Sequence, residues 1–214
     1  MTRGAANGSH GPLRLVLATA NRDKAEEIVS IVRSTCGDRF VLSARPEWIA
    51  VVEETGETLE DNARLKARAV CEATSMPAIA DDTGLEVEAL GGAPGVRSSR
   101  YSGEKATYDQ NVAKLVSELE GVGALSSDQR RARFRTVAIA VFPDGREVVA
   151  EGKVEGHIAT QPRGKGGFGY DPVFVPAGET HTFAEMTPDV KNSLSHRGRA
   201  FRALAVGLGA EETS

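Results

Sequence analysis

The sequence predicts an α/β fold in which helices flank a mixed β-sheet. In the first part of the chain, apolar runs with strand character alternate with segments of helical periodicity, an order typical of parallel strands joined by helices. Two longer apolar runs then flank Pro143-Asp144-Gly145-Arg146, a turn sequence that favours an antiparallel hairpin. Parallel and antiparallel pairing in one chain together indicate a mixed sheet.

The amino-terminal segments predict a strand, a helix and a second strand. Residues 13–18 are an apolar run typical of a buried strand. Residues 22–32 have the apolar spacing of a helix, and either Thr19 or Asn21 is suited to cap its beginning. Residues 40–43 predict the next strand.

The next segments carry four acidic residues at two boundaries. Glu53-Glu54 lies in a loop before a helix predicted at residues 58–73. Residues 77–80 predict a buried strand that ends at Asp81-Asp82, and Thr83-Gly84 is expected to turn the chain. Because successive side chains of a strand point to opposite faces, both aspartates reach one cleft only if the chain turns between them.

The remaining elements include the hairpin and two further helices. They are a loop at residues 91–95, a helix at residues 108–119, strands at residues 134–142, 147–154 and 173–175, and a closing helix at residues 196–207.

The composition is that of an ordinary globular protein and argues against several functions. The 214 residues, 40% of them hydrophobic and 26% charged, suffice for one large domain or two closely joined lobes. A net charge of −4 gives no basic footprint for nucleic acid. No apolar run approaches the ~20 residues that cross a bilayer. Cys36 and Cys71 have no metal-site spacing and indicate free thiols, so a cytoplasmic location is expected.

A strand followed by Thr19-Ala20-Asn21-Arg22-Asp23-Lys24 and then a helix is suited to binding phosphate. The first turn of a helix presents unpaired N–H groups and a partial positive charge, and Lys24 adds a full charge. A capped helix without a ligand is the alternative interpretation.

The four carboxylates Glu53, Glu54, Asp81 and Asp82 are candidates for a divalent metal site. Charges at the end of a buried strand need a metal, a cation or a hydrogen-bond donor to offset their desolvation. Carboxylates combined with substrate phosphates suit Mg2+. An exposed acidic loop and a solvated strand end are the alternatives.

The sequence Gly164-Lys165-Gly166-Gly167-Phe168-Gly169 matches a dinucleotide-binding pattern, but its context argues against that function. The fingerprint has to open a helix, whereas Tyr170-Asp171-Pro172 and a strand follow here. A loop remains, in which Phe168 and Tyr170 can stack on a flat ring and Asp171 can accept a hydrogen bond. A simple turn with a core aromatic residue is the alternative.

Residues 191–199 gather cations and one histidine at the beginning of the last predicted helix. Lys191, His196 and Arg197 can hold an anion or the edge of a base, and a basic surface turn is the alternative. His196 has no neighbouring candidate nucleophile that would make it a general base.

Seven blocks in one order resemble the inosine/xanthosine triphosphate pyrophosphatases, which hydrolyse non-standard purine nucleoside triphosphates. The resemblance covers residues 13 to about 205. The blocks are residues 19–24, 53–56, 62–67, 80–85, 90–95, 166–172 and 195–198.

The resemblance implies an elongated sheet in two lobes with a central nucleotide cleft, and a homodimer as the usual assembly. Residues 13–209 are then a single two-lobed domain, residues 1–12 a disordered lead-in and residues 210–214 a tail. The implied reaction is Mg2+-dependent hydrolysis of ITP, dITP or XTP to the monophosphate and pyrophosphate.

The resemblance also implies roles for individual residues. Asp82 is the expected proton acceptor, and Glu53, Asp81 and Asp82 are the expected metal ligands. The expected substrate-binding residues are Thr19, Ala20, Asn21, Arg22, Asp23, Lys24, Lys66, Thr83, Phe168, Gly169, Tyr170, Asp171, Lys191, His196 and Arg197.

Three points stay open at this level. The division of metal binding and proton transfer between Asp81 and Asp82 is not settled, and residues 96–100 have no assigned role. A pyrophosphatase for other nucleotides and a non-catalytic nucleotide-binding protein remain alternative functions.

Overall fold

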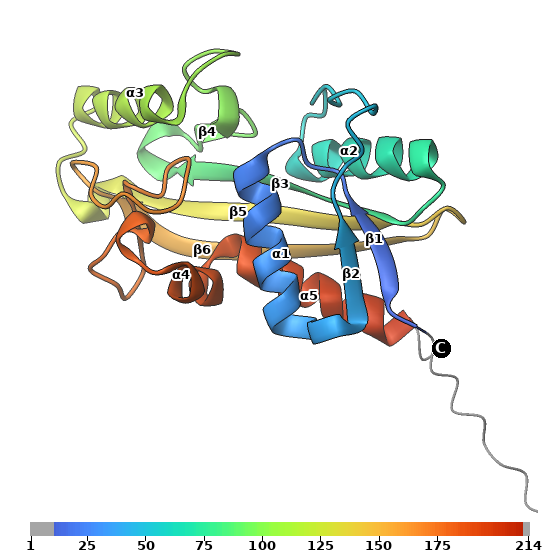
Figure 1. The fold of residues 1–214 in the computed structure, drawn as a ribbon. Helices are drawn as coiled ribbons and strands as arrows, with labels where there is room; N and C mark the ends of the chain where they lie inside the picture. Colours follow the sequence, from blue (N-terminus) through green and yellow to red (C-terminus); the bar gives the residue numbers. More distant parts are fainter. Residues whose placement is uncertain (1–10, 212–214) are drawn as a thin grey trace, which may run out of the picture.

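The computed structural model describes residues 11–211 and contains one mixed seven-stranded sheet (Figure 1). The strands are β1 (Leu13–Leu17), β2 (Phe40–Ser43), β3 (Ala78–Val87), β4 (Pro94–Gly95), β5 (Arg131–Val141), β6 (Glu147–Ile158) and β7 (Phe174–Pro176). The helices are α1 (Arg22–Cys36), α2 (Leu59–Thr74), α3 (Tyr108–Gly121), α4 (Pro188–Leu194) and α5 (His196–Glu211).

The strand order confirms the expected mixed sheet. The main path is β2-β1-β3-β5-β6-β7, and β4 pairs with β3 off this path. β1 is parallel to β2 and β3, whereas β3, β5, β6 and β7 pair antiparallel. The hairpin expected around residues 143–146 joins β5 and β6.

The expected terminal segments lie largely outside the described residues. Residues 1–10 of the expected lead-in and residues 212–214 of the expected tail are not described. α5 continues through Glu211. None of the helices within residues 11–211 has the length and apolar character that a membrane span requires.

The prediction that a strand ends at the two aspartates is wrong. β3 continues through Asp81 and Asp82 to Val87, paired with β5 along its whole length. Thr83-Gly84, expected as a turn, lies inside the strand. A Cβ on Gly84 would lie only 2.8 Å from the carbonyl oxygen of Gly95, so the glycine permits the close approach of β4.

Helices cover both faces of the sheet, and each face has its own apolar core. On one face, α1 and α5 pack on Leu15, Leu17 and Ile79. On the other face, α2 packs on Val16 and Ala80, the residues that alternate with them along the strands. The side chain of Asp81 therefore points toward α1 and α5, and that of Asp82 points toward α2.

A third core lies at the far end of the long strands and forms the second lobe. There α3 packs with Leu85, Phe134 and Phe174. Figure 1 shows α3 over the opposite end of the long strands from α2. Between the lobes, one edge of β3 has no strand partner. β1 pairs only as far as Ile79, and β4 begins to pair at Leu85. The segment that carries both aspartates faces this gap.

Candidate functional site

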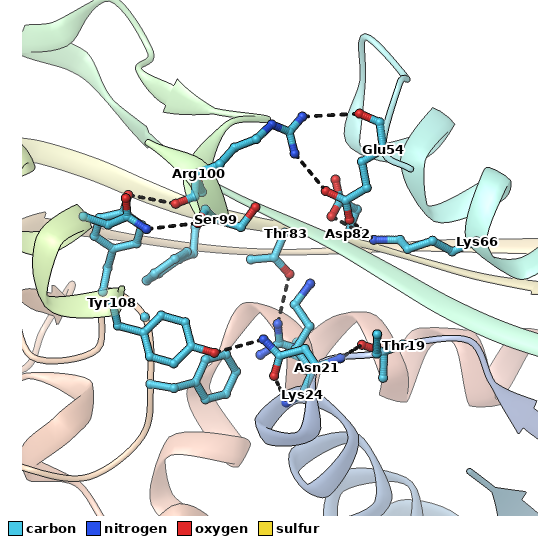
Figure 2. A pocket seen from close by; sticks show the side chains of 18 of the residues that line it. Thr19, Asn21, Lys24, Glu54, Lys66, Asp82, Thr83, Ser99, Arg100 and Tyr108 are labelled. Carbon is cyan, nitrogen blue, oxygen red and sulfur yellow. Dashed lines mark hydrogen bonds and ion pairs between the residues drawn. The ribbon is translucent and has the colours of Figure 1, made fainter. Parts of the chain in front are cut away.

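A cavity of about 400 Å³ opens at the gap between the lobes (Figure 2). Its wall contains most of the residues that the sequence predicts for substrate and metal. They are Thr19, Ala20, Asn21, Lys24, Glu53, Lys66, Asp82, Thr83, Phe168, Gly169, Tyr170, Asp171, Lys191, His196 and Arg197. Arg22, Asp23 and Asp81 are not part of the wall. The side chain of Arg22 is 91% exposed and pairs with Glu26 on the outside of α1.

The beginning of α1 forms one end of the cavity. Asn21 is the cap: its Oδ1 accepts a hydrogen bond from the Lys24 N–H at 3.1 Å. Thr19 Oγ1 in turn accepts from the Asn21 N–H at 3.1 Å. Thr19 and Asn21, which the sequence predicts as alternative caps, therefore both order this turn. The turn presents the positive end of a 15-residue helix to the cavity.

Asp82 lies at the centre of this wall and is linked to α2. Lys66 Nζ donates to Asp82 Oδ1 at 3.1 Å and to Glu54 Oε1 at 2.7 Å. Burial raises the pKa of Asp82 above its ordinary value, and the charge of Glu54 adds to this against the opposing effect of Lys66. A buried carboxylate of this kind holds a proton more readily than a solvated aspartate.

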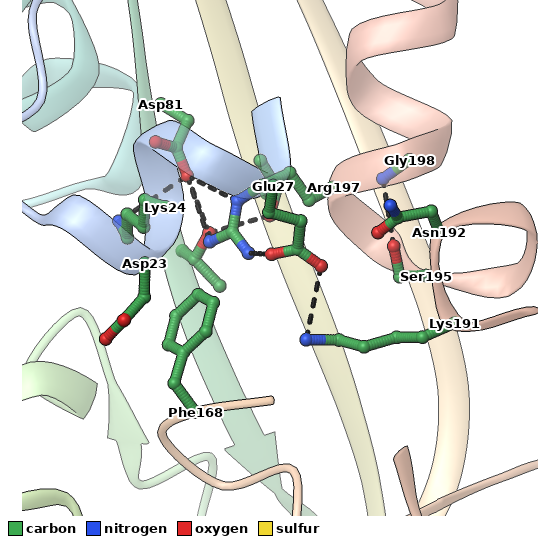
Figure 3. Close-up of polar contacts among 12 residues, drawn as sticks. Asp23, Lys24, Glu27, Asp81, Phe168, Lys191, Asn192, Ser195, Arg197 and Gly198 are labelled. Atoms are coloured by element: carbon green, nitrogen blue, oxygen red, sulfur yellow. Dashed lines mark hydrogen bonds and ion pairs between the residues drawn. The ribbon is translucent and has the colours of Figure 1, made fainter. Parts of the chain in front are cut away.

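Asp81 has a different environment on the other face of the sheet (Figure 3). Its Oδ2 lies 3.4 Å from Lys24 Nζ and accepts hydrogen bonds from two nitrogens of Arg197 at 3.2 Å each. Burial alone would raise the pKa of Asp81, but the charges of Lys24 and Arg197 hold it well below its usual range. Asp81 therefore stays ionised and orients two cations.

Lys191 of α4 and Arg197 of α5 pair with acidic residues of the glycine-rich loop and of α1. Lys191 Nζ lies 2.5 Å from Asp171 Oδ2 and 3.1 Å from Glu27 Oε1. Arg197 Nη1 donates to Glu27 Oε2 at 2.5 Å. Asp171 Oδ2 also accepts a hydrogen bond from the Phe168 N–H at 2.8 Å, and this bond shapes the glycine-rich loop.

An aromatic surface adjoins these charges. The Phe168 ring centroid lies 4.9 Å from Lys191 Nζ and 5.9 Å from the Tyr108 ring. His196 is buried and stacks on Phe134 with ring centroids 4.3 Å apart. Its Nδ1 has no hydrogen-bond partner among the described residues. Burial, helped by Arg197 and Lys191, puts the pKa of His196 well below its ordinary value, so the ring is neutral at pH 7.

The sequence of this chain also matches a known protein family. Residues 15–206 match the model of the Ham1 family. The chain belongs to the Ham1 family.

Curated relatives and solved structures of the Ham1 family resemble the chain over nearly its whole length. The dITP/XTP pyrophosphatase of Nitratidesulfovibrio vulgaris is 50% identical over 197 residues, which cover 89% of this chain and 93% of the relative. That of Elusimicrobium minutum is 45% identical and covers 90% and 98%. The HAM1 protein of Coxiella burnetii has a TM-score of 0.81 at 38% identity, with 92% of this chain and 99% of that chain covered.

The structure also distinguishes the two neighbouring glutamates and adds residues of the second lobe to the cavity of this Ham1 protein. Glu54, rather than Glu53, is the acid that approaches Asp82 through Lys66; Glu53 is exposed on the cavity wall. Arg100 and Tyr108 reach the cavity from the second lobe. Their local sequences give little signal, because an arginine in a loop and a tyrosine at the start of a helix are common on protein surfaces.

The expected metal ligands are not gathered into one cluster. Asp81 and Asp82 lie on opposite faces of β3, and within residues 11–211 no group of three or more potential ligands is close enough to hold a metal ion. Glu54 and Asp82, which share Lys66, are the two carboxylates that lie together on the cavity wall.

Proposed function

We propose that this protein hydrolyses non-standard purine nucleoside triphosphates, with dITP, ITP and XTP as substrates, to the monophosphate and pyrophosphate. The observation that carries the proposal is one cavity whose wall combines cations, at α1 and Lys66, with aromatic and hydrogen-bonding side chains, at Phe168 and His196. The names of the relatives, dITP/XTP pyrophosphatase, agree with it.

The triphosphate occupies the cationic part of the cavity. The first turn of α1 supplies the positive end of the helix dipole, and Lys24 and Lys66 supply full charges at the cavity wall. Thr19 and Asn21 fix this turn through their own hydrogen bonds. Neutralising the polyanion precedes attack by water, so these groups lower the barrier as well as bind.

The residues of this part fit Mg2+. Mg2+ keeps several waters and is bound by one or two carboxylates together with substrate phosphates, so a cluster of three acids is not required. Glu54 and Asp82 are the residues that would hold it, and Glu53 and Asp81 as ligands stay predictions. When bound, the ion would neutralise phosphate charge and activate a water molecule.

Asp82 takes the proton of the attacking water. The water oxygen forms a bond to the α-phosphorus, the bond from the α-phosphorus to the oxygen that bridges to the β-phosphorus breaks, and that oxygen leaves with pyrophosphate. Its raised pKa makes Asp82 a better base than a solvated aspartate, because catalytic bases work best near the operating pH. Asp81 stays charged and orients Lys24 and Arg197.

The aromatic and hydrogen-bonding part selects the base. Hypoxanthine and xanthine carry an oxygen acceptor at position 6 and an N–H donor at position 1, whereas adenine has the reverse pattern. Lys191 or His196 donates to the oxygen, and Asp171 or a backbone carbonyl of its loop accepts from N1. Adenine would leave buried groups unpaired, which can discriminate by ~10⁴-fold. Phe168 stacks on the ring.

A substrate panel tests the proposal. Pyrophosphate release is measured from ITP, dITP, XTP, GTP and ATP with Mg2+, and the nucleoside monophosphate is identified. The first three should turn over at least about 100-fold faster than ATP, and chelation of Mg2+ should abolish release. Equal rates for all five would refute the selectivity and favour a pyrophosphatase for other nucleotides. Mg2+-dependent binding of ITP without release would indicate a non-catalytic nucleotide-binding protein.

Two further expectations belong to this proposal. A homodimer is expected, and sedimentation or light scattering measures it directly. Action on the nucleotide pool implies a cytoplasmic location, in agreement with free thiols at Cys36 and Cys71.

A further inference from the structure

Arg100 links the second lobe to the acidic wall of the cavity (Figure 2). It ends the short 3-10 turn η3 (Ser98–Arg100), in the segment 96–100 to which the sequence analysis assigns no role. Its Nη1 donates to Glu54 Oε2 at 3.1 Å, and its Nη2 donates to the backbone carbonyl of Glu54 at 3.3 Å. One guanidinium thus fixes both the side chain and the main chain of Glu54.

The turn that carries Arg100 is firmly held within the second lobe. Ser98 Oγ accepts from the Leu85 N–H at 2.8 Å and donates to the Gly95 carbonyl at 2.6 Å. The carbonyl of Ser99 accepts from Asn111 of α3 at 3.0 Å. Arg100 therefore projects from a rigid base.

Glu54 itself lies in a segment without helix or strand, between β2 and α2. Its Oε1 accepts from Lys66 at 2.7 Å, and Lys66 donates onward to Asp82. The side chains of Arg100 and Glu54 are 22% and 23% exposed, so their interaction is only partly screened by solvent. Arg100 is thus joined to Asp82 through Glu54 and Lys66.

We propose that Arg100 is a positioning residue that holds Glu54 against Lys66 and Asp82 and thereby forms the divalent-cation face of the cavity. The inference rests on the proposed function, because that function supplies the cation. Residues that orient metal-ligating carboxylates in this way typically change metal affinity 10- to 100-fold when they are removed.

The test compares Arg100→Gln with Arg97→Gln. Arg97 is an exposed arginine of the same segment, so the second variant controls for the lost charge. Mn2+ binding to the nucleotide-free protein is measured by calorimetry, and hydrogen exchange of residues 50–57 is measured without metal. We expect Mn2+ affinity to fall at least about 10-fold and exchange to accelerate in Arg100→Gln, with both unchanged in Arg97→Gln.

Several outcomes would overturn the proposal. Unchanged Mn2+ affinity and exchange in Arg100→Gln would remove the positioning role, even with lower activity, because Arg100 would then act on the substrate directly. Tighter Mn2+ binding would mean that Arg100 only repels the cation. Thermal unfolding checks that the variant is folded; if it is not, Arg100→Lys is measured in the same way, with weaker Mn2+ binding again expected. Mn2+ binding and hydrogen exchange can both be measured even if the protein hydrolyses no nucleotide. A failure of the proposed function is therefore distinguished from a failure of this inference.

Discussion

Asp81 and Asp82 are neighbours in β3, yet their carboxylates lie on opposite faces of the sheet. Asp81 meets Lys24 and Arg197, whereas Asp82 meets Lys66. Burial acts on both, but cations dominate at Asp81 and desolvation dominates at Asp82, so their pKa values move in opposite directions. The two adjacent acids therefore have different roles: Asp81 stays charged, and Asp82 is the proton acceptor.

Asp82→Asn should abolish most turnover and leave the fold intact. The amide keeps the size of the side chain but cannot take a proton, so we expect kcat for dITP to fall about 10²- to 10⁴-fold. Steady-state pyrophosphate release and thermal unfolding measure the two effects. Asp144→Asn, in the exposed β5–β6 turn, is the control. Near-normal turnover of Asp82→Asn would remove Asp82 from the mechanism.

Arg197→Met should destabilise the protein strongly. Arg197 is 2% exposed and pairs with two buried carboxylates, Asp81 and Glu27. Removal of one partner of a buried ion pair costs about 3–5 kcal/mol, because a charge is left without compensation. Urea unfolding measures the loss. Combination with Glu27→Gln should recover part of it, and the exposed Arg199→Met should change little; a small effect of Arg197→Met would contradict the pairing.

His196 should make stability depend on pH below neutrality. The folded protein keeps the ring neutral, because its pKa is lowered by burial, whereas the unfolded chain binds a proton at about pH 6.5. The unfolded state therefore holds more protons in this range. The contribution of His196 to the free energy of unfolding is complete above about pH 6.5 and declines as the pH falls toward the lowered folded pKa.

The comparison of wild type with His196→Gln isolates this contribution. Urea unfolding is measured from pH 7.5 to pH 5 in both proteins. The difference between them should shrink toward low pH. A constant difference between wild type and His196→Gln would show that His196 does not titrate in this way.

Tyr108→Phe should weaken substrate binding more than catalysis. The Tyr108 hydroxyl accepts from Asn21 Nδ2 and donates to Asp23, each at 3.0 Å, and so ties α3 to the first turn of α1. One hydrogen bond contributes about 0.5–1.5 kcal/mol, so KM should rise about 2- to 10-fold with kcat nearly constant. Tyr101→Phe, whose hydroxyl bonds Glu118 within the second lobe, is the control. A fall in kcat alone would argue against this role.

The sequence predicts most of the elements because their signals are local. The cap at Thr19 or Asn21, the helices and the β5–β6 hairpin each depend on a few adjacent residues; the structure confirms the helices and the hairpin and selects Asn21 as the cap. The continuation of β3 through Asp81 and Asp82 depends instead on cations supplied by distant elements. Arg197 is 116 positions away from Asp81, and no local pattern reports that contact.

The sequence likewise predicts some residues of the site and leaves others undecided. Residues in recognisable blocks, such as Lys24, Lys66 and Asp171, line the cavity as expected. The choice between Glu53 and Glu54 depends on which side chain the loop turns inward, and Arg100 reaches Glu54 from the other lobe. These relationships arise from tertiary packing, which adjacent residue types do not encode.

The unbroken path of β3, β5 and β6 through both lobes has a mechanical consequence. Within residues 11–211 the two lobes are joined by these continuous strands and not by a flexible linker, so they cannot rotate freely relative to each other. Any change in the separation of the lobes therefore has to come from bending or twisting of three hydrogen-bonded strands. Such deformation is spread along many backbone hydrogen bonds instead of being concentrated at one hinge residue.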